Sequence, residues 1–192
     1  ASIARWYDRP VLDQAAIAQV RQEAWPDVRG ADELHDVLHT LVALPVGSDD
    51  RVVAAAPVRP DWNSSVSSGE VALPRPGEGL WGYVSSAGSS WGAFFERLAG
   101  EGRAAEAVAG GRRYWVAAER AKTFGLLFPE ARFEQQLAEV ETAVHSSDDA
   151  LPAMVTGWRA QSGPVTARQL GSVLGLPASE IDKALLRMEA SG

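Results

Sequence analysis

The sequence contains no cysteine, and this absence excludes several chemistries at once. Disulfides, thiolate zinc sites, iron–sulfur clusters and a cysteine nucleophile all require thiols. The chain also lacks any apolar run near the roughly 18 residues that a membrane-spanning helix needs, so no membrane partner is expected. Lysine is scarce as well, since 2 of the 18 basic residues are lysines and the rest are arginines. These absences favour a folded cytoplasmic protein whose cations are nearly all guanidinium groups.

The charge is distributed unevenly along the 192 residues. The net charge of −7 at pH 7 argues against a wholly basic nucleic-acid binder. Residues 89–125 nevertheless carry +2 and residues 151–192 carry +1, whereas residues 1–88 and 126–150 each carry −5. Arginine suits bidentate phosphate contacts, although a GC-rich genome produces the same bias. Two mildly basic segments are therefore the places where the sequence favours a nucleic acid.

The first 90 residues predict two amphipathic helices followed by an irregular segment. An apolar series runs from Pro10 to Pro26, and we assign residues 1–30 to a leading helix and its connector. Leucines and valines at three- and four-residue spacing predict a second helix over residues 32–44. Residues 57–88 are rich in proline, glycine and serine, and we interpret them as a loop insertion.

A helix, a β-hairpin and another helix are expected next. The helix covers residues 91–99 after a cap at Ser89 or Ser90, and its aromatic residues share one face. Residues 103–109 and 112–118 have the pattern of two strands, and the Gly110–Gly111 pair between them is typical of a tight hairpin turn. Residues 119–128 complete this part as a helix that Pro129 ends.

The last 42 residues predict three short helices. The first covers residues 151–160. Thr166 is placed to cap the second, and Gly175 is placed to end it. Pro177 lies at the start of the third, where a missing N–H costs nothing. Its expected apolar positions are Ile181, Leu185, Leu186 and Met188.

The predicted class is therefore α+β and helix-dominated, with tandem winged-helix modules. Helices joined by a tight turn describe a helix-turn-helix, and an added hairpin supplies the wing. We expect one winged helix over residues 31–128 with the insertion inside it. An acidic connector follows over residues 129–150, of which residues 133–144 can be helical and 146–150 form a linker. Residues 151–192 are the start of a second winged helix whose wing is missing.

The hairpin and the last helix supply the candidate DNA-binding side chains. Arginines at a hairpin can grip phosphates, while a neighbouring aromatic ring stacks on a base. Within the second strand, alternation places Tyr114 on one side and Trp115 on the other. The candidate DNA-binding residues are Arg103, Arg112, Arg113, Tyr114, Lys183 and Arg187.

Two alternatives stay open beside this interpretation. The hairpin can be a solvated tip above core aromatics, and the modules can bind proteins in an assembly that never touches DNA. The charges on the last helix nearly cancel, which weakens a phosphate-reading role there. A homo-oligomer is compatible with either interpretation.

Three stretches of the chain resemble one known family. They are Ala31-Asp-Glu-Leu-His-Asp-Val-Leu38, Arg113-Tyr-Trp-Val-Ala-Ala-Glu119, and Gly163-Pro-Val-Thr-Ala-Arg-Gln-Leu170 followed by Leu174-Gly-Leu-Pro177. These resemble bacterial large helicase-related (Lhr-type) proteins, in the long C-terminal extension that follows the helicase core. The resemblance covers nearly the whole chain and is weakest at residues 57–88.

The resemblance implies a parent that is an ATP-dependent 3′-to-5′ DNA helicase acting in DNA repair, with tandem winged helices in its extension. It also implies a nucleoid-associated cytoplasmic location and ATP and Mg²⁺ for the parent motor. No GxxxxGK[ST] phosphate loop occurs here, and no catalytic residue is carried over. This chain is then an accessory segment without a cofactor, whose partners are single-stranded or tailed duplex DNA and the parent's other domains.

A metal site is the remaining alternative. His35-Asp-Val-Leu-His39 mimics the HExxH pattern, and on a helix the two histidines share a face, as a zinc pair requires. Asp36 would then activate water, although it is one methylene shorter than glutamate. The only other histidine, His145, lies beside the expected linker, so a third ligand is lacking. The plainer interpretation places His35 and His39 on the polar flank of a core helix.

Overall fold

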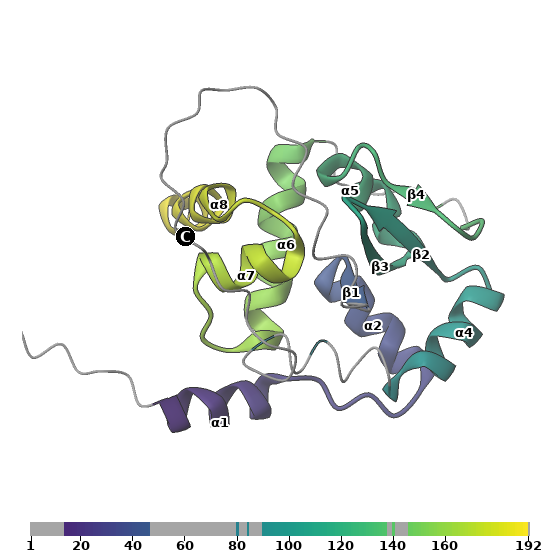
Figure 1. Ribbon diagram of the computed structural model, residues 1–192, viewed down its shortest axis with the longest axis horizontal. Coiled ribbons are helices and arrows are strands. Elements are labelled where there is room, and N and C mark those ends of the chain that lie inside the picture. Colours follow the sequence, from purple (N-terminus) through teal and green to yellow (C-terminus); the bar gives the residue numbers. More distant parts are fainter. Residues whose placement is uncertain are drawn as a thin grey trace, which may run out of the picture.

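The computed structural model describes residues 14–46, 80, 84, 90–137, 140 and 146–191. In these residues it contains seven α-helices, one 3-10 turn and a four-stranded antiparallel sheet, so the class is α+β and helix-dominated (Figure 1). The elements are α1 (Gln14–Ala24), α2 (Ala31–Leu41), β1 (Leu44–Val46), α4 (Gly92–Gly100), β2 (Ala104–Ala109), β3 (Arg112–Ala117), η2 (Ala118–Arg120), α5 (Ala121–Leu127), β4 (Arg132–Phe133), α6 (Ser147–Ser162), α7 (Ala167–Leu174) and α8 (Ala178–Ser191).

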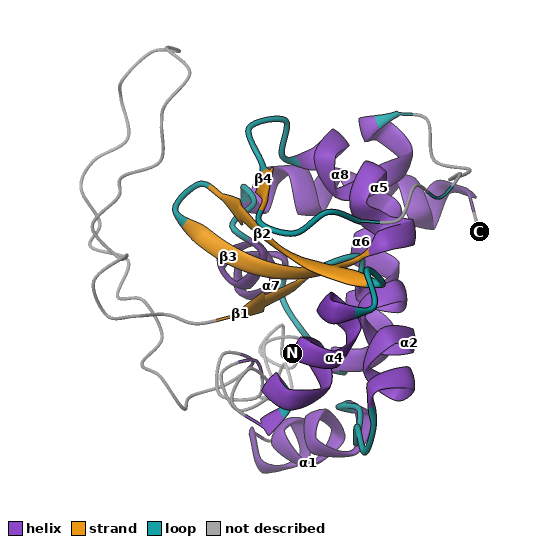
Figure 2. Ribbon diagram, turned by 90° about the vertical axis from the view of Figure 1, so that its right-hand side faces the viewer, coloured by secondary structure: helices purple, strands orange, loops and turns teal. Residues whose placement is uncertain are grey.

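The sheet has the strand order β1-β3-β2-β4, so the hairpin strands lie in its middle (Figure 2). On one side, β1 pairs with β3 and sets Leu44 opposite Trp115. On the other side, β4 pairs with β2 and sets Phe133 opposite Ala107. We call the elements from α2 to β4 the sheet unit, and α6, α7 and α8 the helical unit.

Both faces of the hairpin are covered over most of its length. Alternation along β3 sends Tyr114 toward α5, where its ring centroid lies 5.2 Å from that of Phe124. Trp115 points the other way and stacks on Phe95 of α4, with ring centroids 4.3 Å apart. The predicted division of these aromatics between two faces is confirmed. The four residues from Tyr114 to Ala117 are all buried, so the strand is a core element along most of its length.

In the helical unit, caps define where the helices begin and end. Ser146 caps α6, since its hydroxyl accepts a hydrogen bond from the Asp149 amide. Thr166 and Gln169 form a capping box at the start of α7. Gly175 ends α7 in a left-handed conformation with φ of 71°.

The two units share one continuous core. Gly157 of α6 lies against the backbone of α2, and a Cβ atom there would collide with the Thr40 carbonyl. One residue on, the fully buried indole N–H of Trp158 donates to the Ala43 carbonyl at 3.3 Å. Figure 1 shows α6 running between the sheet unit and helices α7 and α8.

A tryptophan cluster extends this core to α1. The rings of Trp25 and Trp91 stack with an interplanar angle of 8° and centroids 6.3 Å apart. The ring of Trp158 approaches Trp25 at 6.2 Å with a tilt of 50°. The leading helix therefore joins the core through the residue that follows it.

Most predicted helices are confirmed, but one ends earlier than expected. The stripe over residues 32–44 suggested a single helix, whereas α2 ends at Leu41 and β1 begins at Leu44. Val42 makes the corner with a positive φ of 69°. Pairing with β3 then holds the three residues of β1 in the extended conformation.

The connector predicted over residues 129–150 also differs. Arg132 and Phe133 form β4, because the edge of β2 offers them hydrogen-bonding partners, so Phe133 does not open the helix that was expected over residues 133–144. The expected linker at 146–150 is the cap and first turn of α6, where Asp148 and Asp149 favour the helix N-terminus. Of the apolar positions expected in α8, Ile181 is fully buried, whereas Leu186 is 64% exposed.

The insertion predicted over residues 57–88 lies outside the described residues, apart from Leu80 and Val84, which are helical and buried. None of the helices in the described part of the chain has the length and apolarity that crossing a membrane would demand.

Candidate functional site at the hairpin turn

The hairpin turn brings two of the candidate arginines to the boundary between the units. Gly110 and Gly111 both have positive φ, 55° and 74°, as a two-residue hairpin turn of the I′ type requires. Arg112 and Arg113 follow as the first residues of β3. Because side chains alternate along a strand, these neighbours point to opposite faces of the sheet and have different surroundings.

Arg112 points to the helical unit and binds the end of α7. Its Nη1 donates to the Ser172 carbonyl at 2.6 Å and to the Val173 carbonyl at 3.3 Å. These carbonyls belong to the last turn of α7, where no intrahelical N–H is available to them. A guanidinium at this position also interacts favourably with the negative end of the helix dipole.

Tyr114, two residues further, binds the next carbonyl of the same turn. Its hydroxyl donates to Leu174 at 3.1 Å, and its side chain is 1% exposed. Burial raises the pKa of the Tyr114 phenol to about 12, since the phenolate would be poorly solvated. A ring enclosed in this way cannot stack on a base, so the predicted stacking role of Tyr114 does not fit its position.

Together these contacts complete the C-terminus of α7 from another part of the chain. The remaining end carbonyl, that of Gly171, accepts from the Gly175 and Leu176 amides. All four last carbonyls therefore have donors, and the hairpin supplies those of three. Gly175 is required for two reasons, because its φ is positive and a Cβ atom would lie 2.7 Å from the Tyr114 hydroxyl.

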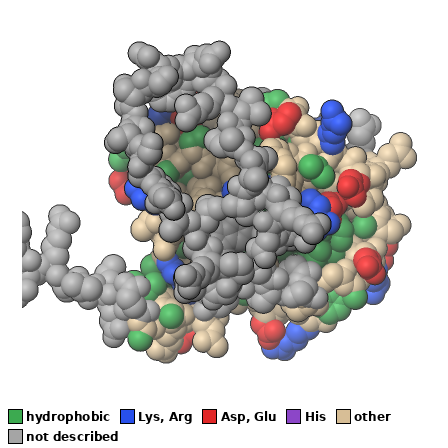
Figure 3. Space-filling model, viewed as in Figure 1, with side chains coloured by type: hydrophobic (Ala, Val, Ile, Leu, Met, Phe, Trp, Pro, Cys, Tyr) green, Lys and Arg blue, Asp and Glu red, His purple; other side chains and the backbone are tan. Residues whose placement is uncertain are grey.

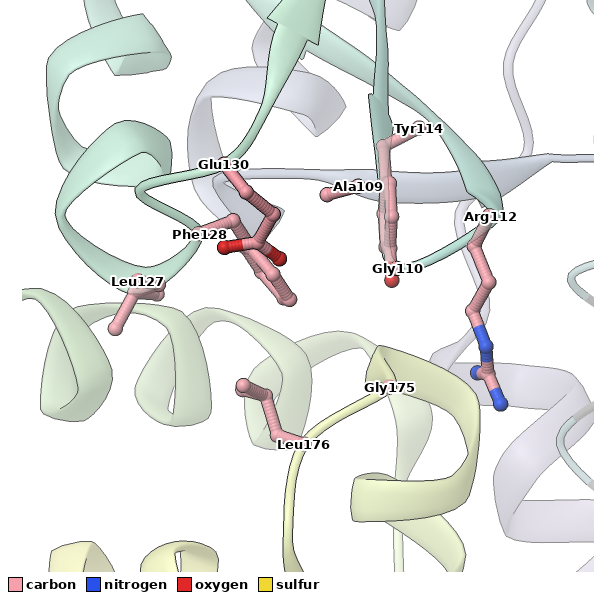
Figure 4. A pocket seen from close by; sticks show the side chains of 9 residues that line it. All are labelled: Ala109, Gly110, Arg112, Tyr114, Leu127, Phe128, Glu130, Gly175 and Leu176. Carbon is pink, nitrogen blue, oxygen red and sulfur yellow. The ribbon is translucent and has the colours of Figure 1, made fainter. Parts of the chain in front are cut away.

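A cleft of about 220 Å³ lies beside this contact (Figure 4). Phe128 and Leu176 form apolar walls, and the Glu130 carboxylate points toward the cleft from the loop after α5. The Arg112 guanidinium points away from it, toward α7. A second groove, of about 200 Å³, lies between the three helices of the helical unit.

Arg113 lies on the other face and is 54% exposed. Its Nη1 is 3.4 Å from Glu106 Oε1, near the limit of a hydrogen bond. Arg113 therefore keeps most of its five donors toward solvent.

Arg103 is far from the turn, at the opposite end of the hairpin. Its Nη1 donates to Asp32 at 2.7 Å and to Glu101 at 3.3 Å. The hydrogen bond from Arg103 holds the pKa of the Asp32 carboxyl below its ordinary value. The structure thus does not bring Arg103 together with Arg112 and Arg113, although all three belong to one hairpin.

The two candidates on α8 are exposed but paired. Lys183 Nζ donates to Glu180 at 2.7 Å within the helix, and Arg187 Nη1 donates to Asp148 of α6 at 3.2 Å. Such exposed pairs contribute little to stability and open readily. On the face seen in Figure 3, the basic and acidic side chains of the described residues are likewise interspersed.

The histidine pair on α2 has other partners. His35 Nε2 lies 3.1 Å from Glu119 Oε2, and the His39 carbonyl accepts from Arg120. Burial lowers the pKa of the His39 imidazole, and Arg120 lowers it further. Among the described residues, no three or more histidine, aspartate or glutamate side chains are grouped so that they could hold a metal ion. The geometry around His35 and His39 thus gives the zinc interpretation no support.

No protein-family model matches the chain, and no curated protein is found as a relative of it. The resemblance to Lhr-type proteins accordingly stays a prediction that rests on three sequence motifs.

The sequence did not indicate the backbone acceptors of this site. Ser172, Val173 and Leu174 take part through their carbonyl oxygens, which every residue type possesses. The sequence predicted that Gly175 ends a helix. Its closeness to Tyr114 could not be predicted, because the two segments that meet here are about 60 residues apart in the chain.

Proposed function

We propose that this chain is an accessory segment of an ATP-dependent DNA helicase acting in DNA repair. Its role is to hold or guide DNA and to pack modules together around the motor. The ATPase, with its ATP and Mg²⁺, belongs to other domains of the parent, and single-stranded or tailed duplex DNA is the expected partner.

The order of elements in the sheet unit supports a winged-helix module. Among the elements that the structure describes, a helix (α2), a short strand (β1), a helix (α4) and a hairpin (β2–β3) occur in this order, and β1 pairs with the second hairpin strand. A winged helix shares one part of this arrangement, the short strand that pairs with the hairpin and extends it to three strands. In the helical unit, α7 and α8 are joined by a tight glycine-containing turn, as in a helix-turn-helix.

The observation that carries the proposal is the binding of α7 by the hairpin. Arg112 and Tyr114 attach the turn of the sheet unit to the last three carbonyls of α7. The orientation of the helical unit is thereby specified by hydrogen bonds as well as by the shared core. A segment that holds the sheet unit and the helical unit in a set orientation suits the guiding of a nucleic acid or the positioning of neighbouring domains.

The proposal is tested by fluorescence anisotropy with labelled single-stranded and tailed duplex DNA. Binding that weakens between about 50 and 200 mM salt is expected, since phosphate contacts release counterions. The double variant Lys183→Ala/Arg187→Ala should lower the salt slope if α8 contacts phosphates, whereas Arg168→Ala, which removes one exposed arginine charge on α7, is the control. An absence of binding to both DNAs at low salt would contradict a DNA-holding role.

A protein-binding array is the second candidate, and the paired cations favour it. Arg103, Lys183 and Arg187 are three of the six candidate DNA-binding residues, and each of them has a carboxylate partner. This candidate predicts no DNA binding together with concentration-dependent self-association, which light scattering coupled to size exclusion would detect. A monomer that binds DNA would argue against it.

A further inference from the structure

Two arginines lie on either side of one valine on the face of the sheet opposite to Tyr114. In the register of the sheet, Val108 of β2 is opposite Arg113 of β3 and also opposite Arg132 of β4. Directly opposite residues of antiparallel strands point to the same face. Arg113, Val108 and Arg132 therefore form one row across three strands. Two strand spacings separate the two arginine Cα atoms, a distance of about 10 Å.

The two arginines are exposed and weakly partnered. Within the part of the chain that the structure describes, the Arg132 side chain makes no hydrogen bond and no ion pair, and the Arg113 side chain makes only its long contact with Glu106. Val108 between them is half-buried.

Two carboxylates lie on the same face and define the local charge. Glu106 comes two residues before Val108, and Glu134 comes two residues after Arg132. Glu106 has a side chain 13% exposed and lies deeper than Arg113, whereas Glu134 is exposed. The two arginines and the two glutamates have a formal net charge of zero. Binding of an anion therefore depends on how the two guanidinium groups are placed, and not on a net positive charge of this face.

Guanidinium geometry suits phosphate. Each arginine presents a planar fork of donors that can bind two phosphate oxygens at once. Their long side chains allow the two heads to approach one another above the valine. The other candidate cations are less available, because Arg112 is engaged with α7 and Lys183 has a carboxylate partner at 2.7 Å.

We propose that Arg113 and Arg132 form a phosphate-binding pair, which takes two neighbouring phosphates of one nucleic-acid strand with the intervening sugar against Val108. The inference rests on the proposed function in one respect, since DNA is the expected source of the phosphates. A free polyphosphate offers the same chemistry, and the test distinguishes these two sources.

The test uses the whole chain with Arg113→Ala, Arg132→Ala and their combination. Arg168→Ala is the matched control, because it removes one exposed arginine charge on α7, in the other unit. The probes are a labelled 12-nucleotide single strand, followed by anisotropy at several salt concentrations, and inorganic tripolyphosphate, followed by calorimetry. Each single variant should reduce the logarithmic salt slope for the single strand by about 0.7, and the double variant by about 1.4. The control should leave the slope unchanged, and circular dichroism checks that every variant is folded.

The outcomes distinguish the phosphate-binding pair from the proposed DNA function. Loss of binding to both probes in the double variant supports the pair and the DNA function together. Weakened tripolyphosphate binding, with no DNA binding by the unmodified chain, supports the pair as a phosphate site and contradicts the DNA function. DNA binding that is the same in the double variant and in the control overturns the pair but leaves the DNA function standing. An unmodified chain that binds neither probe overturns both.

Discussion

The sheet unit and the helical unit are organised by different kinds of interaction. In the sheet unit, rings cover both faces of the hairpin, with Trp115 against Phe95 on one side and Tyr114 against Phe124 on the other. The helical unit has no strand among its described residues, and its apolar helix faces are bounded by polar caps at Ser146 and Thr166. The comparison shows that the helical unit depends on its neighbour, because the cap at the end of α7 is donated by the hairpin.

The largest expected effect comes from the backbone contact that joins the units. Gly157→Ala places a Cβ against the Thr40 carbonyl, so α6 and α2 must separate. We expect a loss of about 3 kcal/mol in the free energy of unfolding, at the upper end for overpacking, measured by urea denaturation. Gly125→Ala in α5 is the control, since a Cβ there meets nothing within 4 Å. Equal stability of the two variants would show that the units are not in close contact.

The next prediction compares how much stability is lost when each of two adjacent arginines is replaced. Arg112→Ala leaves two carbonyls at the end of α7 without donors, and we expect a loss of about 2 kcal/mol. Arg113→Ala removes an exposed side chain with one long contact, and its effect should stay below about 0.5 kcal/mol. Urea denaturation of both variants measures the difference. A similar loss for both would mean that the alternation of side chains does not separate their roles.

Tyr114→Phe is expected to have a smaller effect, because it removes one hydrogen bond and keeps the ring. The loss should be about 1 kcal/mol near neutral pH. The phenol has a folded-state pKa of about 12, against an ordinary value of 10.0. Its raised pKa contributes stability that is complete below pH 10 and is lost as the pH rises toward 12.

The loss of stability at alkaline pH can be measured separately. Between pH 10 and 12 the unmodified chain should lose stability more steeply than Tyr114→Phe, and the two denaturation midpoints should converge. Parallel curves would place the hydroxyl in water and would contradict its contact with Leu174.

The smallest effect concerns the sheet unit alone. The pKa of Asp32 is lowered by Arg103, so this pair contributes stability above the ordinary value of 3.8, which disappears as the pH falls below it. Asp32→Asn should lower the melting temperature slightly at pH 7 and leave it unchanged near pH 2. A difference that persists in acid would show that the carboxylate charge is not responsible. Both groups are exposed, so the shift should be small compared with that of Arg112→Ala.

The sequence predicted the elements whose signals are local. Helices α4, α7 and α8 follow apolar stripes bounded by glycine, threonine and proline, and the Gly110–Gly111 turn follows from its residue types. Strands β1 and β4 were missed because three and two residues are too few to show alternation. Their conformation is set by pairing with β3 and β2, which the local sequence does not encode.

The candidate site shows the same limit. Alternation correctly separated Tyr114 from Trp115, but it could not decide between rings that stack on a base and core aromatics below a hairpin tip, and both rings are buried. The partners of Arg112 lie 60 and 61 positions away and are backbone atoms, so no residue type marks them. The row of Arg113 and Arg132 likewise depends on the pairing of β4 with β2, whereas the sequence placed Arg132 in an acidic connector and Phe133 at the start of an expected helix.

The tryptophan cluster lies where the two units meet, so the spectrum of its rings reports on the contact between the units. Trp25 and Trp91 stack nearly in parallel, and Trp158 joins them from the helical unit. Indole transitions at such separations couple, so we expect the near-ultraviolet circular dichroism of the chain to contain a contribution that depends on all three rings. Loosening of α6 from the rest would change that contribution before the helices melt. Docking of the units can therefore be followed without a label, at the same time as helix content in the far ultraviolet.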